Sequence, residues 1–402
     1  MINRSRHSLL ISFLLLSFCS FSQNSWLQRS NYGGGTRQGA SAFVIGGKGF
    51  VAAGWNGVFY NDLWEYDPTL DSWAQKAAFA GAGRYFGSAF AIGQYGYYGL
   101  GWAQSNSFND VWKYDLAANS WSQIAAFPGA GRHEGIGMGI GLKGYMGTGY
   151  DGGPNYYNDW YEYDPGSNSW TVRTNVPGGT REGAVSFVLG SKGYVCIGRG
   201  TGFKNDLQEF DPVTNSWTTK SNFPGAARDD AFGFGIGISG FVGTGQDAST
   251  IYDDFYEYNQ ANDTWYQRAN YGGGIHSYSY GFAVGGKGYA GIGRNGSMNT
   301  NDHWEYAPFT GTGEIENEVL VSIFPNPFSS FCMVIVEFSD KNSNFEFIHY
   351  SLYDLEGNIV QTKEFRPGKE LMIGRGNLPD GVYFLSICAE EKNLRTFKLI
   401  IN

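Results

Sequence analysis

The sequence has few charged residues and few cysteines. Charged side chains make up 16% of the 402 residues, and the acidic ones outnumber the basic ones to give a formal net charge of −9. Nucleic-acid-binding proteins normally carry a basic face, so this balance excludes nucleic acid as a partner. Four cysteines are too few for a disulfide scaffold. Cys332 and Cys388 have the option of pairing after export, but buried thiols are the expected state.

The sequence also lacks the apolar spacing of amphipathic helices over any long stretch. It contains instead 60 Gly, 30 Phe, 27 Tyr and 12 Trp. Many glycines indicate many tight turns, and many aromatic residues indicate short strands that pack face to face. The composition therefore predicts an all-β protein.

The N-terminus has the order of a secretory signal peptide. Arg4 and Arg6 precede an apolar run over residues 9–16, and the small residues Ser20 and Ser22 follow it. The run is too short for a membrane-spanning helix, and no later segment is apolar enough to be one. We expect residues 1–22 to be removed during export and the mature chain to have no transmembrane helix.

One sequence unit recurs six times. Each copy starts at an anchor residue, and successive anchors are 47 to 49 residues apart, at Arg37, Arg84, Arg132, Arg181, Arg228 and His276. A tryptophan precedes every anchor by 11 residues, at Trp26, Trp73, Trp121, Trp170, Trp217 and Trp265. An Asn-Asp or Asp-Asp motif follows every anchor, with its second residue at Asp62, Asp110, Asp159, Asp206, Asp254 and Asp302. Landmarks that recur in one order at such regular offsets predict a repeat architecture.

Each copy contains signals for four short strands. In the first copy they are residues 40–45, 50–54, 63–66 and a strand that opens at Trp73, with turn residues between them. The glycine pair, the Tyr-Asp-Pro turn and the downstream Trp followed by Pro-Gly and Arg resemble the kelch repeat. A spacing near 50 residues also fits kelch blades better than the shorter WD40 repeat. The resemblance implies a six-bladed β-propeller.

The two ends of the repeat array complement each other. The sixth copy ends after Tyr306 without its own tryptophan, whereas Trp26 precedes the first anchor. A strand around Trp26 would complete the sixth blade and remove free sheet edges. We assign residues 23–308 to the propeller.

A different domain follows a linker over residues 309–318. Its sequence predicts seven short strands, which are typical of an immunoglobulin-like β-sandwich, at residues 319–324, 332–338, 349–353, 359–364, 371–373, 382–387 and 397–401.

Four segments of residues 319–402 resemble the C-terminal sorting domain of type IX secretion substrates, which occur in Bacteroidetes. They are Ile323-Phe324-Pro325-Asn326-Pro327-Phe328, Leu352-Tyr353-Asp354-Leu355-Glu356-Gly357, Leu378-Pro379-Asp380-Gly381-Val382-Tyr383 and Lys398-Leu399-Ile400. The resemblance implies recognition by outer-membrane secretion machinery and a secreted or outer-membrane surface location. A plain accessory sandwich is the alternative.

Candidate ligand contacts gather on one face of the propeller. In an antiparallel blade the start of the first strand and the end of the second lie on the same face, which we call the mouth. The anchors come to this face together with the residues after them: Gln38, Tyr85, His133, Glu134, Glu182, Asp229, Asp230 and Tyr278. A second set comes from the ends of the second strands: Trp55, Trp102, Tyr150, Arg199, Gln246 and Arg294.

The second set varies while the sequence around it repeats, so we predict that it contacts a ligand. Aromatic faces beside arginine and carboxylate groups suit a sugar or an acidic glycan. The repeated anchors also have a structural interpretation, which is pairing with carboxylates or turn carbonyls of their own blades. The Asn-Asp motifs lie on separate blades and cannot converge on calcium, so we expect turn and strand-edge caps. We expect no metal and no cofactor.

Two functions remain. The first, which we favour, is a binding module for a glycan or protein ligand without catalysis. The second is a sugar-modifying enzyme of mutarotase or epimerase type, since kelch propellers include galactose oxidase and the sialic-acid mutarotase. His133 with Glu134, Glu182 or Asp229 would supply its base and acid, and a tight cluster of these groups with separated pKa values would favour it. Serine-hydrolase, HExxH and phosphate-loop motifs are missing from the sequence.

Overall fold

The computed structural model of this chain describes residues 24–308, 319–324, 326, 328–338, 348–355, 358–366, 371–389 and 392–402. The predicted signal peptide and the predicted linker lie outside the described residues. The described residues form strands and turns, and none of them belongs to a helix long and apolar enough to cross a membrane.

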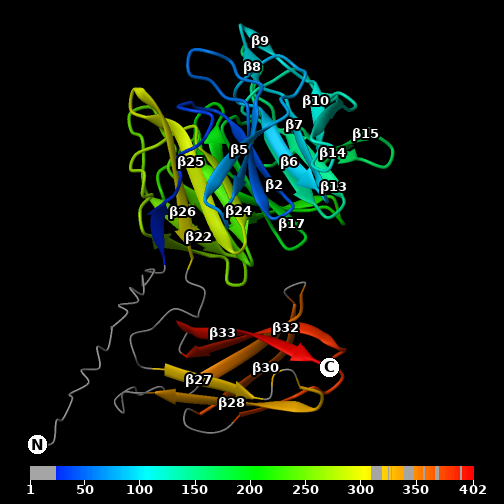
Figure 1. Cartoon of the computed structure of the whole chain (residues 1–402), viewed down its shortest axis with the longest axis vertical. Helices are drawn as coiled ribbons and strands as arrows, with labels where there is room; N and C mark the ends of the chain where they lie inside the picture. Colours follow the sequence, from blue (N-terminus) through cyan, green and yellow to red (C-terminus); the bar gives the residue numbers. More distant parts are fainter. Residues whose placement is uncertain are drawn as a thin grey trace, which may run out of the picture.

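The repeat region forms six four-stranded antiparallel sheets, the blades of a propeller (Figure 1). The first three blades are β2 (Ser41–Ile45), β3 (Lys48–Ala52), β4 (Leu63–Asp67) and β5 (Ser72–Lys76); β6 (Ser88–Ile92), β7 (Tyr95–Gly99), β10 (Val111–Asp115) and β11 (Ser120–Gln123); and β12 (Ile136–Ile140), β13 (Lys143–Gly147), β14 (Trp160–Asp164) and β15 (Ser169–Arg173). A two-stranded hairpin, β8 (Trp102–Ala103) and β9 (Asn106–Ser107), projects from the second blade at the top of Figure 1.

The remaining blades follow the same order. They are β16 (Val185–Leu189), β17 (Lys192–Arg199), β18 (Phe203–Asp211) and β19 (Ser216–Lys220); β20 (Phe232–Ile236), β21 (Ser239–Gly243), β22 (Phe255–Asn259) and β23 (Thr264–Arg268); and β24 (Tyr280–Val284), β25 (Lys287–Asn295), β26 (Met298–Ala307) and β1 (Ser25–Gln28). The last sheet joins the two ends of the propeller, because β1 pairs with β26 in the register Trp26 opposite Tyr306.

Alternation of small and large residues lets the inner strands crowd around the axis. In β12 the sequence Ile136-Gly137-Met138-Gly139-Ile140 places the large residues in the core and the glycines against the preceding blade. A Cβ atom at Gly139 would lie only 1.9 Å from the carbonyl oxygen of Ala91, so this position has no room for a side chain. The close approach of neighbouring blades thus explains part of the high glycine content.

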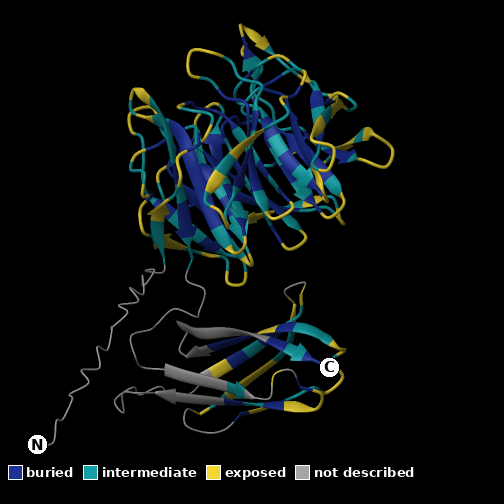
Figure 2. Ribbon diagram, in the orientation of Figure 1, coloured by how far each residue is buried: buried dark blue, intermediate teal, exposed yellow. Residues whose placement is uncertain are grey.

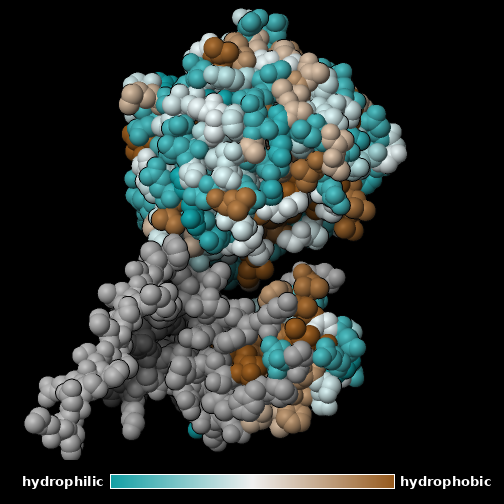
Figure 3. Space-filling view, in the orientation of Figure 1, coloured by the Kyte–Doolittle hydropathy of each residue, from teal (hydrophilic) through white to brown (hydrophobic). Residues whose placement is uncertain are grey.

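Aromatic residues fill the spaces between blades, and Figure 2 shows the resulting buried interior. In one such space, Trp26 from β1 lies 5.0 Å from the rings of both Phe255 and Tyr271. The propeller face in Figure 3 is mainly hydrophilic, with apolar residues in small patches. The apolar core of the propeller therefore lies between the blades.

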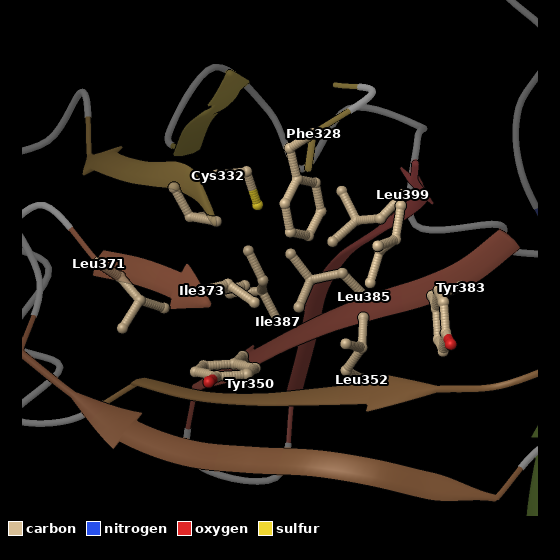
Figure 4. Close-up of a cluster of buried hydrophobic side chains, with 12 residues drawn as sticks. Phe328, Cys332, Tyr350, Leu352, Leu371, Ile373, Tyr383, Leu385, Ile387 and Leu399 are labelled. Carbon is tan, nitrogen blue, oxygen red and sulfur yellow. The ribbon is translucent and has the colours of Figure 1, made fainter. Parts of the chain in front are cut away.

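The C-terminal domain has two facing antiparallel sheets. One contains β27 (Val319–Phe324), β28 (Phe331–Phe338) and β31 (Leu371–Gly374); the other contains β30 (Ile359–Phe365), β29 (Ile348–Tyr353), β32 (Gly381–Ala389) and β33 (Lys392–Ile401). Figure 4 shows Phe328, Leu385 and their neighbours pointing toward one another between the sheets. Cys332 belongs to this core as a free, buried thiol, whereas the side chain of Cys388 lies outside what the structure describes.

Candidate functional site

Each arginine anchor forms an ion pair with the acidic motif of its own blade. The pairs are Arg37–Asp62, Arg84–Asp110, Arg132–Asp159, Arg181–Asp206 and Arg228–Asp254, and in the sixth blade His276 Nε2 lies 3.3 Å from Asp302 Oδ1. The arginines are 0% exposed. Arg132 is typical: it donates to Asp159 Oδ2 at 3.0 Å and to the carbonyl of Thr148 at 3.0 Å, and its guanidinium lies 3.8 Å from the Tyr157 ring centroid.

These contacts match the structural interpretation of the anchors. A buried guanidinium whose donors are engaged by a carboxylate and a carbonyl has little left to offer a ligand. The Asn-Asp motifs hold the anchors and do not gather around a common point. We therefore exclude all six anchors from the ligand site proposed below, although the sequence made them candidates.

The second residue after each anchor forms a ring around the propeller axis. We call Gly39, Phe86, Glu134, Gly183, Asp230 and Tyr278 the axial ring. Each donates its backbone N–H to the carbonyl of the preceding member, and the cycle closes from Gly39 back to Tyr278, with N···O distances between 2.7 and 3.1 Å. All six have positive φ, between 52° and 65°. Four non-glycine residues thus hold a backbone conformation that favours glycine, which fixes their side chains at the axis.

The first residue after each anchor pairs with the end of the second strand. The pairs are Gln38–Trp55, Tyr85–Trp102, His133–Tyr150, Glu182–Arg199, Asp229–Gln246 and Ser277–Arg294, each an isolated antiparallel bridge. Two reciprocal backbone hydrogen bonds hold each pair, as in His133 N to Tyr150 O and Tyr150 N to His133 O. Opposed residues in such bridges carry their side chains on the same side. The two predicted sets therefore meet at the mouth.

The first three blades give the mouth an aromatic half. Tyr85 contacts Trp55, Phe86 and Trp102, with ring centroids 5.9, 4.0 and 5.6 Å away. His133 continues this surface, 6.4 Å from Trp102 and 5.3 Å from Tyr150. The side chains of Trp55, Trp102 and Tyr150 are partly exposed, so their faces remain accessible.

The fourth to sixth blades, together with Glu134 of the third blade, give the mouth a charged half. We call Glu134, Glu182, Asp229 and Asp230 the acid cluster. Arg199 donates through Nε to Glu182 Oε1 at 3.1 Å, and the same nitrogen lies 3.4 Å from Asp229 Oδ2. Gln246 donates to Asp230 and to the Tyr278 hydroxyl. Arg294 forms no ion pair within the part of the chain that the structure describes.

Burial and mutual repulsion perturb the acid cluster. Burial, followed by the charges of Glu182 and Asp229, holds the pKa of Glu134 well above that of an ordinary glutamate. The pKa of Asp230 is raised for the same reasons, chiefly burial and the charge of Glu134. Burial also raises the pKa of Asp229 to about 6, although Asp230 and Arg199 oppose the shift. The four carboxyl groups therefore have too few cationic neighbours for all of them to be ionised at once.

His133 is perturbed in the opposite direction. Burial lowers its pKa to about 4, so the imidazole is neutral near pH 7. Its Nδ1 lies 3.1 Å from Ser107 Oγ, and Ser107 donates its hydroxyl proton to the carbonyl of Asp151. Ser107 therefore accepts from Nδ1–H, which leaves Nε2 as a proton acceptor.

Histidine and carboxylate lie close enough to act together. A ring nitrogen of His133 and one carboxylate oxygen each of Glu134 and Glu182 lie within 4.8 Å of one another. This geometry could also ligate a metal ion, but Glu182 is already engaged by the Arg199 guanidinium. The arrangement instead fits proton exchange between a neutral base and a carboxylic acid.

A small cavity lies at the axis beside the axial ring. Its volume is about 120 Å³, and its walls combine Phe86, Glu134, Asp230 and Tyr278 of the ring with the glycine, alanine and serine residues that follow the ring positions. Phe86 and Tyr278 contact each other with ring centroids 5.0 Å apart. The cavity therefore has both aromatic and acidic walls.

The sequence pointed to most of this site but missed Phe86, Phe59 and Tyr156. Phe59 packs 5.9 Å from Trp102, and Tyr156 stacks 4.7 Å from Tyr150, so both extend the aromatic half. The repeat register contained the signal for Phe86, because it holds the same position after its anchor as Glu134 and Asp230.

Comparisons with known proteins agree with this architecture. The kelch motif matches residues 36–78, and the secretion system C-terminal sorting domain matches residues 322–402. The solved structure of YjhT is similar with a TM-score of 0.59 and 15% identity, covering 77% of this chain and 99% of that one. Among curated proteins, none matches this chain.

The sorting domain indicates export through the type IX system to a secreted or cell-surface location. The six four-stranded blades, the kelch motif and the similarity to YjhT describe the fold of residues 24–308. The chain is thus a kelch-type β-propeller joined to a C-terminal sorting domain of the type IX secretion system.

Proposed function

We propose that the exported propeller binds carbohydrate at its mouth. The observation that carries this proposal is the division of the mouth into an aromatic half and a charged half. The apolar faces of sugar rings pack on partly exposed aromatic side chains, as on Trp102 and Tyr150. Their hydroxyl groups hydrogen-bond to charged and amide side chains, of which Arg199, Gln246 and Arg294 are available at the same face.

A glycan array probed with the full exported chain tests the proposal. We expect a restricted set of glycans to bind, and we expect Trp102→Ala to abolish most of that binding. Tyr266→Ala is the matched control, because Tyr266 is 40% exposed and belongs to β23, outside the mouth. A folded protein that binds no glycan would exclude this function and favour a protein ligand.

A second function is favoured by the proximity of His133 to Glu134. In mutarotation, a base takes the proton of the anomeric hydroxyl while an acid protonates the ring oxygen, and the C1–O5 bond breaks to give the open-chain sugar. Rotation about the C1–C2 bond and the reverse transfers close the ring as the other anomer. Neutral His133 is suited to the base role, and Glu134, with its raised pKa, is suited to the acid role.

Anomer exchange followed by NMR tests this second function. A sugar that binds on the array is dissolved as one pure anomer, and its equilibration is followed with and without the protein. Catalysis predicts faster equilibration by the wild-type chain, and a large loss of that rate in Glu134→Gln when the variant is saturated with the sugar. Equilibration at the uncatalysed rate would leave a binding module.

A further inference from the structure

The acid cluster contains more carboxyl groups than its protein neighbours can balance if all of them are ionised. Four carboxyl groups meet there, and Arg199 is the one cation that forms an ion pair with them in the described part of the chain. Glu182 is 2% exposed, Asp229 is 1% exposed and Asp230 is 8% exposed. Buried carboxyl groups are normally paired with a cation or with several donors.

Asp229 is the least satisfied member of the cluster. Its partners are few among the described residues. Arg199 Nε lies 3.4 Å from Oδ2, and the carboxyl group of Asp230 shares a hydrogen bond with it. A nearly inaccessible carboxylate is normally held by several N–H or hydroxyl donors, so Asp229 is poorly satisfied in the folded protein.

The axial ring leaves space between two of the carboxyl groups of the acid cluster. Gly183 stands between Glu134 and Asp230 in the ring, and it contributes no side chain between them. A Cβ atom at Gly183 would lie 2.8 Å from Asp230 Oδ1. Glu134 and Asp230 both line the axial cavity of about 120 Å³, opposite the aromatic residues Phe86 and Tyr278.

A pocket with acidic and aromatic walls is selective for a cation. Carboxylates form charge-assisted hydrogen bonds with an ammonium group, and aromatic faces attract it through their negative π-surface. A neutral hydroxyl would gain less from these walls, and an anionic group would be repelled.

We propose that the mouth selects carbohydrate with a free amino group, whose ammonium enters the axial cavity between Glu134 and Asp230. This inference rests on the proposed function, because the aromatic half of the mouth would hold the sugar rings. The ammonium supplies the positive charge that the acid cluster lacks. Acidic and N-acetylated sugars are then disfavoured ligands.

Calorimetric titration of the full exported chain tests the proposal. The probes are β-1,4-linked hexamers of glucosamine, N-acetylglucosamine and glucose, with an oligogalacturonate as the acidic probe. The titrations are made at about pH 6, where the amine is protonated, in the presence of EDTA. We expect the glucosamine hexamer to bind at least about tenfold more tightly than the other three.

Two further readouts connect that preference to the acid cluster. Glu134→Gln and Asp230→Asn should each remove most of the preference, whereas Asp164→Asn, at the end of β14 and outside the mouth, should keep it. Titration in two buffers of different ionisation enthalpy should show that the glucosamine hexamer displaces protons from the cluster. Thermal unfolding checks that each variant is folded.

The outcomes separate this proposal from the proposed function. Equal or tighter binding of the N-acetylated, neutral or acidic hexamer would overturn the amino-sugar selectivity and leave carbohydrate binding intact. The same holds if all four probes fail while another glycan on the array binds. Failure of every glycan on the array would overturn both.

Discussion

The buried anchors are the residues on which blade geometry depends most. Arg132 is 0% exposed and has Asp159 as its counter-ion. Removing one partner of such a pair leaves an uncompensated charge in the interior, whereas both partners together balance much of each other's desolvation. Removing one partner of an exposed ion pair has a much smaller effect on the free energy of unfolding, because water solvates the charge that remains.

Asp159→Asn should therefore lower the free energy of unfolding by about 3 kcal/mol. The control is Asp164→Asn, whose partner is Lys143 and whose side chain is 40% exposed. This control should change stability by less than about 1 kcal/mol. Urea unfolding followed by tryptophan fluorescence measures both, and equal effects would contradict the assigned role of the anchors.

His303 makes stability depend on pH. It is 0% exposed, and burial lowers its pKa to about 3. Its Nδ1 is hydrogen-bonded to the Tyr280 hydroxyl at 2.8 Å, while Nε2 has no partner among the described residues. Below about pH 6.5 the imidazole of His303 binds a proton in the unfolded chain but not in the folded chain. The free energy of unfolding therefore falls as the pH falls toward 3.

His303→Phe should remove this contribution. Between about pH 6 and pH 4 the wild type should lose up to about 1.4 kcal/mol per pH unit more than the variant. In the variant, Tyr280 loses its hydrogen-bond partner at every pH. The test therefore compares the pH dependence of the unfolding free energy in the two proteins and not their absolute stabilities. Urea unfolding at several pH values gives both slopes, and parallel slopes would show that His303 titrates normally.

At the scale of the element, β1 is the strand that closes the propeller. It covers the edge of β26, and Arg29, just after it, forms an ion pair with Glu305. Trp26 completes an aromatic cluster with Phe255 and Tyr271. Loss of β1 would expose both an open sheet edge and an apolar surface.

Deleting residues 23–28 from the mature chain should therefore accelerate amide hydrogen exchange in β26 by at least about tenfold and promote self-association. Leu27→Ser is the control, because Leu27 is 37% exposed and the substitution keeps the backbone pairing. Unchanged exchange in β26 after the deletion would contradict a closing role for β1.

The elements were easier to predict than the site. The regular spacing of Trp, Arg and Asp predicts the blades, and the seven C-terminal strands lie within a few residues of their predicted positions. The axial ring was not predicted, because positive φ normally indicates glycine or asparagine, and Phe86, Glu134 and Tyr278 give no such signal. The sequence also allowed two roles for the anchors, ligand contact and structural pairing. Choosing between them required the three-dimensional positions of their partners.

At the scale of the whole molecule, stability and recognition are assigned to different parts of each blade. The repeated Arg–Asp pairs and inter-blade aromatic residues hold the frame. The residue at the end of the second strand differs between blades, for example Trp55 in the first and Arg294 in the sixth. These differences give the mouth two chemically distinct halves. A repeat architecture permits this division, because a ligand site can change without altering the residues that each blade needs to fold.

The most direct test of this account is the affinity of the full exported chain for its best array glycan, measured by calorimetry for wild type, Trp102→Ala and Arg199→Ala. If the mouth is the site, both substitutions should weaken binding at least about tenfold, and Tyr266→Ala should leave it unchanged. Undiminished affinity in folded Trp102→Ala and Arg199→Ala would place the ligand elsewhere and contradict the account.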